Sequence, residues 1–153
     1  MGARQRARAV IAETGLDMTR FPTAAHLVSW AGLCPAARQS GTRNRAGKNH
    51  KGDTWLRGPL GQAANAAART PTFLGERYHR IARRRGKAKA QVAVARSILV
   101  IIWHLLADPA ARYTDLGPGY YQARTDKDKK IRNHIRQIEA LLGHPITITP
   151  KAA

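Results

Sequence analysis

Ser40 is the residue of this chain whose type and surroundings best suit covalent chemistry on a phosphate. The residues around it are Gln39, Gly41 and a set of cations, namely Arg38, Arg43, Arg45, Lys48 and Lys51. Arginine can bind phosphate oxygens with two N–H groups, and glycine lets a backbone approach closely because it has no Cβ. A hydroxyl among such groups could attack a phosphodiester. On composition alone, a solvated basic loop explains the same residues.

Two other serines compete with Ser40 for this role. Ser29 and Ser97 fall inside expected helices, where a serine hydroxyl usually donates a hydrogen bond to a carbonyl of the preceding turn. The reaction would also require loss of the serine proton and usually a metal ion at the leaving oxygen. The nine acidic residues are scattered and the six histidines occur singly, so we expect this chain to hold no metal by itself.

Helices are expected to position the Ser40 segment, which we predict to be a loop between two of them. Helical spacing and capping residues predict helices over residues 4–14, from Thr23 to the break at Gly32, and over residues 53–69. Further helices are expected from Thr70 to about Arg85, over residues 87–107 and over residues 127–142. The alternation in residues 145–150 predicts either a short strand or an irregular tail.

Apolar residues at helical spacing predict which faces are buried. We expect Val10 and Ile11 of the first helix to point inward. The second and third helices contribute His26, Leu27, Trp30, Leu33, Trp55, Leu56, Leu60, Ala63, Ala64 and Ala67. Residues 87–107 are apolar nearly all the way round and are expected to be too short to span a bilayer. The predicted fold is all-α, a compact bundle around this helix.

The charge of the chain favours a polyanionic partner. Its 153 residues include 27 lysines and arginines against 9 acids, a formal net charge of +18. Nucleic acid is the better candidate than an anionic membrane, because there is no uninterrupted apolar run of membrane-spanning length and no signal peptide. Cys34 is the single cysteine, which excludes an internal disulfide. We expect a cytoplasmic protein with one domain over residues 1–125 and a basic helix and tail over residues 126–153.

A second basic segment follows at the end of the fourth expected helix. Between residues 77 and 89 there are seven cations and no acid: Arg77, Arg80, Arg83, Arg84, Arg85, Lys87 and Lys89. An ordinary solvated face would include carboxylates. The pattern therefore predicts a track for the DNA backbone, which gives affinity without sequence recognition. We expect this track to share a face of the molecule with Ser40.

The order of several short motifs resembles the C-terminal domain of the IS116/IS110/IS902 group of insertion-sequence transposases. The matching residues run from Trp30-Ala31-Gly32-Leu33 and Pro35 through Gln39-Ser40-Gly41, Lys51-Gly52 and Leu56-Arg57 to R-R-R-G-K-A-K-A and D-L-G-P-G-Y-Y. The resemblance implies that Ser40 is the nucleophile that attacks DNA, and it adds Arg57 and Gly41 to the expected DNA-binding residues. It also implies a bridge-type RNA and a homo-oligomer as partners.

The same resemblance implies that part of the machinery lies outside this chain. In the family, four acidic residues of a separate N-terminal RuvC-like domain hold magnesium. A helix-hairpin-helix of the family is also only partial here, because Met1-Gly2-Ala3-Arg4 stands where its first helix should be. We therefore expect the tail of a longer protein, which binds DNA but cannot complete strand exchange alone. Thr42 stands where the family often has a further glycine.

Two other function classes fit parts of the sequence. A noncatalytic basic helical protein that coats nucleic acid would explain the charge and the helical pattern equally well. It has no use for one fixed hydroxyl, so the two interpretations differ at Ser40. A self-sufficient metallonuclease is disfavoured by the scarcity of carboxylates.

Overall fold

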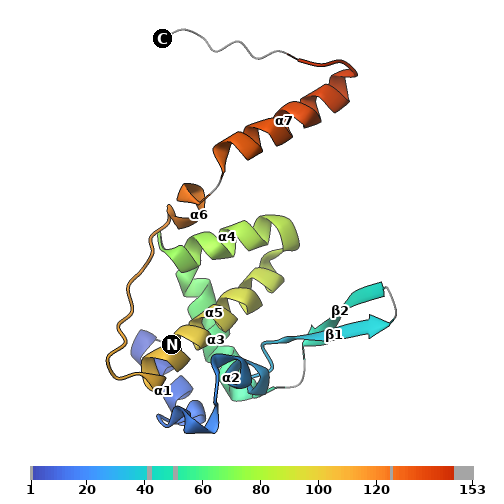
Figure 1. Cartoon of the computed structure of the whole chain (residues 1–153). Helices are drawn as coiled ribbons and strands as arrows, with labels where there is room; N and C mark the ends of the chain where they lie inside the picture. The colour runs from blue at the N-terminus through green and yellow to red at the C-terminus, as the bar shows by residue number, and fades with distance from the viewer. Residues whose placement is uncertain (1, 41–42, 50–51, 125, 147–153) are drawn as a thin grey trace. The chain divides into compact units, whose positions relative to one another are not determined.

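The computed structural model describes residues 2–40, 43–49, 52–124 and 126–146, and within 35–49 it describes the backbone alone. The chain forms two compact units, Met1–Pro118 and Gly119–Ala153 (Figure 1). The first unit contains α1 (Ala3–Thr14), the short 3-10 helix η1 (Met18–Arg20), α2 (Ala24–Trp30), β1 (Pro35–Ser40), β2 (Arg43–Asn49), α3 (Thr54–Ala67), α4 (Phe73–Arg85) and α5 (Lys87–Ala107). The second contains α6 (Tyr120–Ala123) and α7 (Lys127–Leu142).

The core of the first unit is a helical bundle with α5 at its centre. This helix packs against α2, α3 and α4, and α3 in turn packs against α1. Leu27, Leu56, Leu60 and Leu99 are fully buried there. Each such side chain stabilises the fold by about 1.5–3 kcal/mol relative to an exposed one. The prediction of an all-α bundle around this helix is confirmed.

Only one stripe of α5 is fully buried, through Ala90, Val94, Ala95 and Leu99. Its other apolar residues are mostly half-buried. At 21 residues the helix is also long and apolar enough to cross a membrane, so the expectation that it is too short is wrong. The central helix of a water-soluble bundle satisfies the same criteria, which makes this weak support for a membrane.

Specific hydrogen bonds define several helix ends. The Asp53 carboxylate accepts from the backbone N–H groups of Trp55 and Leu56 at 2.8 and 3.2 Å, which caps α3 as predicted. Thr72 caps α4 through the Gly75 N–H at 3.2 Å. Inside α5, the Ser97 hydroxyl donates to the Ala93 carbonyl at 3.0 Å, as expected for a serine in a helix interior.

The segment predicted to be a loop around Ser40 is instead an antiparallel β-hairpin. β1 and β2 pair with Ala37 opposite Ala46 and Ser40 opposite Arg43, and an irregularity in the register separates Pro35 from Ala37. The hairpin leaves the bundle after α2 and returns to it before α3 (Figure 1). Cross-strand backbone hydrogen bonds satisfy main-chain groups that a loop would leave to water, and polar side chains do not prevent this pairing.

Four residues expected on buried faces are exposed, three of them large and apolar. Trp55 is 80% exposed, Ile11 41% and Trp30 39%. Adjacent helical residues differ in direction by about 100°, and the inward direction is taken by Leu56 beside Trp55 and by Val10 beside Ile11. His26, also expected on an apolar stripe, is exposed and shares a hydrogen bond with the Thr23 hydroxyl at 2.9 Å.

The second unit is built on α7, whose carboxylate cap is Asp126. The helix carries apolar residues at helical spacing, but Ile131, Ile138 and Leu142 remain about half exposed within the unit. The domain boundary expected after residue 125 falls between α6 and α7, within this unit. Of the tail expected as a strand or irregular segment, residues 147–150 lie outside the described residues.

Candidate nucleic-acid interface

The register of the hairpin places Ser40 and three arginines on one face of the ladder. Arg38 lies opposite Arg45, and Ser40 lies opposite Arg43. Residues two apart on a strand share a face, and directly opposed residues share it as well. The four positions therefore form one group, which we call the serine face. Of the other predicted site residues here, Gly41 and Lys51 lie outside the described residues.

The serine face concentrates positive charge on a small element. It holds three arginines, and neither strand contains an acidic residue. Like charges directly opposite one another, as at positions 38 and 45, destabilise a strand pair. An isolated two-stranded hairpin is only marginally stable in water. A phosphate bound between these arginines would attract each of them and so offset their mutual repulsion. Lys48 belongs to β2 but is not a member of a registered pair.

A backbone contact holds the two ends of the hairpin together. Gly52 lies so close to the end of α2 that a Cβ added to it would overlap the backbone of Ala31 and Gly32. Gly32 has a φ of 67°, which favours glycine. Beyond this contact, Leu33 and Leu56 are buried on the two sides. The root of the hairpin is therefore fixed to the bundle by close packing.

The amino terminus of α3 follows the hairpin, but its first N–H groups are already occupied by a side chain and are not available to a phosphate. The Asp53 carboxylate already accepts from two of its free N–H groups. Glu13, at the end of α1, lies beside this carboxyl. Partial burial and the charge and hydrogen bonding of Asp53 raise the pKa of Glu13 above its usual value.

This carboxyl pair predicts a pH effect on stability. A raised pKa means that the folded state binds the proton more tightly, so the contribution of Glu13 is present at low pH and lost as pH rises through the raised value. Glu13→Gln should remove that dependence and gain stability over the wild type as pH increases. Chemical unfolding at several pH values measures the difference between the two proteins.

The matched control for that experiment is Asp17→Asn. Hydrogen bonds from Thr19 lower the pKa of Asp17, so its contribution is present above the unfolded pKa and is lost as pH falls. The Asp17 variant should therefore lose stability relative to the wild type as pH rises. If Glu13→Gln keeps the pH dependence of the wild type while Asp17→Asn behaves as expected, the pairing of Glu13 with Asp53 is absent.

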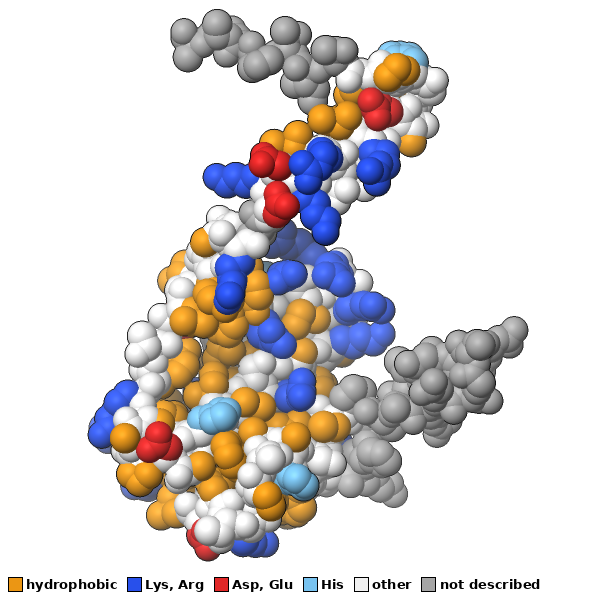
Figure 2. Space-filling model, in the orientation of Figure 1, with side chains coloured by type: hydrophobic (Ala, Val, Ile, Leu, Met, Phe, Trp, Pro, Cys, Tyr) orange, Lys and Arg blue, Asp and Glu red, His pale blue; other side chains and the backbone are white. Residues whose placement is uncertain are grey.

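The predicted basic track lies at the turn from α4 into α5. Figure 2 shows lysine and arginine side chains gathered over this turn. Its exposed members are Arg80, Arg83, Arg84, Arg85, Lys87 and Lys89, while Arg77 is half-buried. Gly86, with a φ of 87°, ends α4 and lets α5 begin at the next residue. That the track shares a face with Ser40 stays a prediction, because the Ser40 side chain is not described.

The structure groups some predicted residues and leaves others apart. Ser40, Arg38, Arg43 and Arg45 come together through the register, whereas Arg57 is a half-buried residue of the first turns of α3. Sequence reasoning missed the exposure of Trp30 and Trp55 on either side of the hairpin. The signal that could have found Trp55 is its place directly before Leu56, since both cannot point to the same core.

Comparison with known proteins identifies one family. A family model described as the transposase IS116/IS110/IS902 family matches residues 3–80 of the 153. The matched segment begins in α1, contains the whole hairpin and ends within α4. No curated protein and no solved structure matches the chain.

Proposed function

This chain belongs to the IS116/IS110/IS902 family of transposases, and from that premise we propose that it binds DNA and supplies Ser40 as the nucleophile for strand cleavage in insertion-sequence transposition. The observation that carries the proposal is the register of the hairpin, which groups the Ser40 position with those of Arg38, Arg43 and Arg45. Cations grouped around one hydroxyl position suit a phosphate at which negative charge grows during attack. We place this activity in the cytoplasm.

The proposed step exchanges one phosphate ester for another. The Ser40 oxygen forms a bond to phosphorus and gives up its proton, and the bond from phosphorus to one strand oxygen breaks. That oxygen takes up a proton and becomes a free hydroxyl, so the strand end is held as a phosphoserine. The three arginines would stabilise the crowded phosphoryl oxygens through charge-assisted hydrogen bonds. Reversal onto a second strand end would complete the exchange without net hydrolysis.

The donor set of the described residues does not fit a magnesium site. No group of three or more histidine, cysteine, aspartate or glutamate side chains comes together in the parts of the chain that the structure describes. Glu13 and Asp53 are only two carboxyls, and Asp53 is engaged as a helix cap. We derive no step through a metal. The acidic residues that the family resemblance assigns to a RuvC-like domain would enter from elsewhere in the assembly, as would any bridge-type RNA or second subunit.

DNA binding by the track at the α4–α5 turn is tested by the salt dependence of affinity. Each phosphate neutralised by a cation contributes about 0.9 to the slope of log affinity against log salt concentration. Arg84→Gln should therefore lower the slope by about 0.9, weakening binding to all duplex sequences alike. Fluorescence anisotropy with a labelled duplex at several salt concentrations measures the slope.

Arg112→Gln is the matched control for that variant. Its guanidinium donates to the carbonyls of Pro109 and Ala111 at 2.7 and 2.8 Å, outside the track. This control should keep the wild-type slope. Equal slopes for the Arg84 variant and the wild type would remove Arg84 from the DNA path.

A further inference from the structure

Trp55 is exposed to an extent that is unusual for its residue type. Tryptophan is highly buried on average in folded proteins, yet 80% of this side chain is exposed. Transferring so large an apolar ring from water into a contact with a partner is favourable. A partner that covers Trp55 would therefore explain why this side chain is kept exposed. Within its own unit, the inward direction beside Trp55 belongs to Leu56, which is completely buried.

The backbone that carries this ring is held in place. The Trp55 N–H donates to the Asp53 carboxylate at 2.8 Å, and the next residue anchors α3 in the core. The ring is therefore presented from a fixed backbone, with only its side-chain torsions left to order. Binding through it costs little conformational entropy, which is the usual advantage of a tryptophan at a binding surface.

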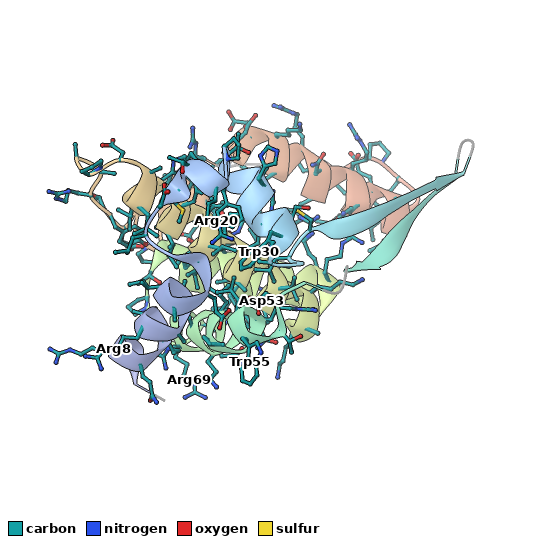
Figure 3. The ribbon with its side chains drawn as sticks, turned by 90° about the horizontal axis from the view of Figure 1, so that it is seen from below. Arg8, Arg20, Trp30, Asp53, Trp55 and Arg69 are labelled. Atoms are coloured by element: carbon teal, nitrogen blue, oxygen red, sulfur yellow. The ribbon has the colours of Figure 1, made fainter. Side chains whose placement is uncertain are left out.

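Trp55 also stands beside the root of the hairpin. It follows Gly52 by three residues, and Gly52 touches the backbone of Ala31 and Gly32. Trp30 comes directly before Ala31 in the sequence and is 39% exposed. Its ring packs against that of Phe21, with 5.4 Å between the ring centroids. In Figure 3, Asp53 lies between the two tryptophans on this side of the bundle.

We propose that Trp55 stacks against an unpaired base of the nucleic-acid strand whose phosphate the hairpin receives. This inference rests on the proposed function, since it assumes that the strand passes the serine face. Every base has a π-face that can stack on an indole ring, so the contact would be tolerant of sequence. It would favour a strand that is locally opened at the site of attack over an intact duplex.

The expected effect follows from the strength of base stacking. Loss of one aromatic platform lowers affinity for a single strand by about tenfold to a hundredfold. Trp55→Ala should show this loss for oligothymidylate and leave the affinity for a short duplex unchanged. Trp55→Phe keeps an aromatic face and should stay close to the wild type. Leu16→Ala, which removes another exposed apolar side chain in the segment between α1 and η1, is the control.

The experiment compares the full-length wild-type chain and these three variants by anisotropy with labelled oligothymidylate, oligouridylate and a short duplex at one salt concentration. Thermal unfolding confirms that the variants fold. A single-strand loss confined to Trp55→Ala supports the inference, and the oligomer that shows it identifies the strand as DNA or RNA. Equal single-strand affinity of the wild type and Trp55→Ala overturns the inference alone. A wild-type chain that binds none of the three probes overturns the proposed function itself.

Discussion

Replacing Ser40 with alanine is expected to reduce strand cleavage in a complemented transposition assay by about a thousandfold or more, the scale of loss when a nucleophilic serine is removed. The variant lacks the oxygen that would bond to phosphorus. Arg43, which is paired with this position, and the other two arginines of the serine face remain, so affinity for duplex DNA should be unchanged. The assay measures excised and joined products, and anisotropy measures binding.

Ser29→Ala and Ser97→Ala are the controls for this experiment. Ser29 is exposed on α2, and the Ser97 hydroxyl donates to a carbonyl within α5. Both variants should retain transposition. Wild-type activity in the Ser40 variant would assign this residue a structural role and would favour the noncatalytic interpretation, in which a basic helical protein coats nucleic acid.

Gly52→Ala is expected to destabilise the first unit by about 1–3 kcal/mol, the usual cost of forcing a side chain into a filled space. The added Cβ would overlap the backbone of Ala31 and Gly32, and a main chain cannot swing aside as a flexible side chain can. The root of the hairpin would then separate from the end of α2. Chemical unfolding measures the loss, and strand cleavage should fall with it because the serine face is displaced.

Gly58→Ala is the matched control. Gly58 belongs to α3, and a Cβ there meets nothing within 4 Å. Alanine in a helix interior is favoured over glycine by about 0.5–1 kcal/mol, but Pro59 follows Gly58 and disfavours a helical residue with a Cβ before it. The two effects oppose each other, so this variant should change the stability much less than Gly52→Ala. If the two alanine variants have the same stability, the close contact between Gly52 and the end of α2 is not present in solution.

The helices were predictable because their signals are local. The apolar run of α5 and the amphipathic pattern of α7 give the same bounds in sequence and structure, at Lys87–Ala107 and Lys127–Leu142. Asp53 was predictable as a cap because a short carboxylate before an apolar run can reach the N–H groups of the first turn. The short helices η1 and α6 carry no comparable pattern and were missed.

The hairpin was not predictable from apolar periodicity, because its strands contain almost no apolar alternation to detect. Apart from Pro35, the residues of β1 and β2 are alanines, glycine, polar groups and cations. The available signal was the spacing, since Ser40 and Arg43 are paired and only two residues, one of them glycine, separate them. Charge composition favoured a solvated loop and concealed this signal.

The candidate site was predictable in composition but not in arrangement. Proximity in sequence was enough to associate Ser40 with Arg38 and Arg43, yet which residues share a face depends on the strand register. The exposure of Trp55 was missed for a related reason. Helical periodicity gives the position of the apolar face only approximately at a first turn, where Leu56 and not its neighbour enters the core.

The most direct test of the central claim is whether the Ser40 position meets a DNA phosphate. In a Cys34→Ser background, which removes the natural thiol, Ser40→Cys is mixed with a duplex that carries a disulfide-activated thiol tethered to one phosphate. Ser29→Cys is the control, because residue 29 is exposed on α2. We predict rapid cross-linking at position 40 and slow cross-linking at position 29. Equal rates at the two positions, or faster reaction at position 29, would contradict the account.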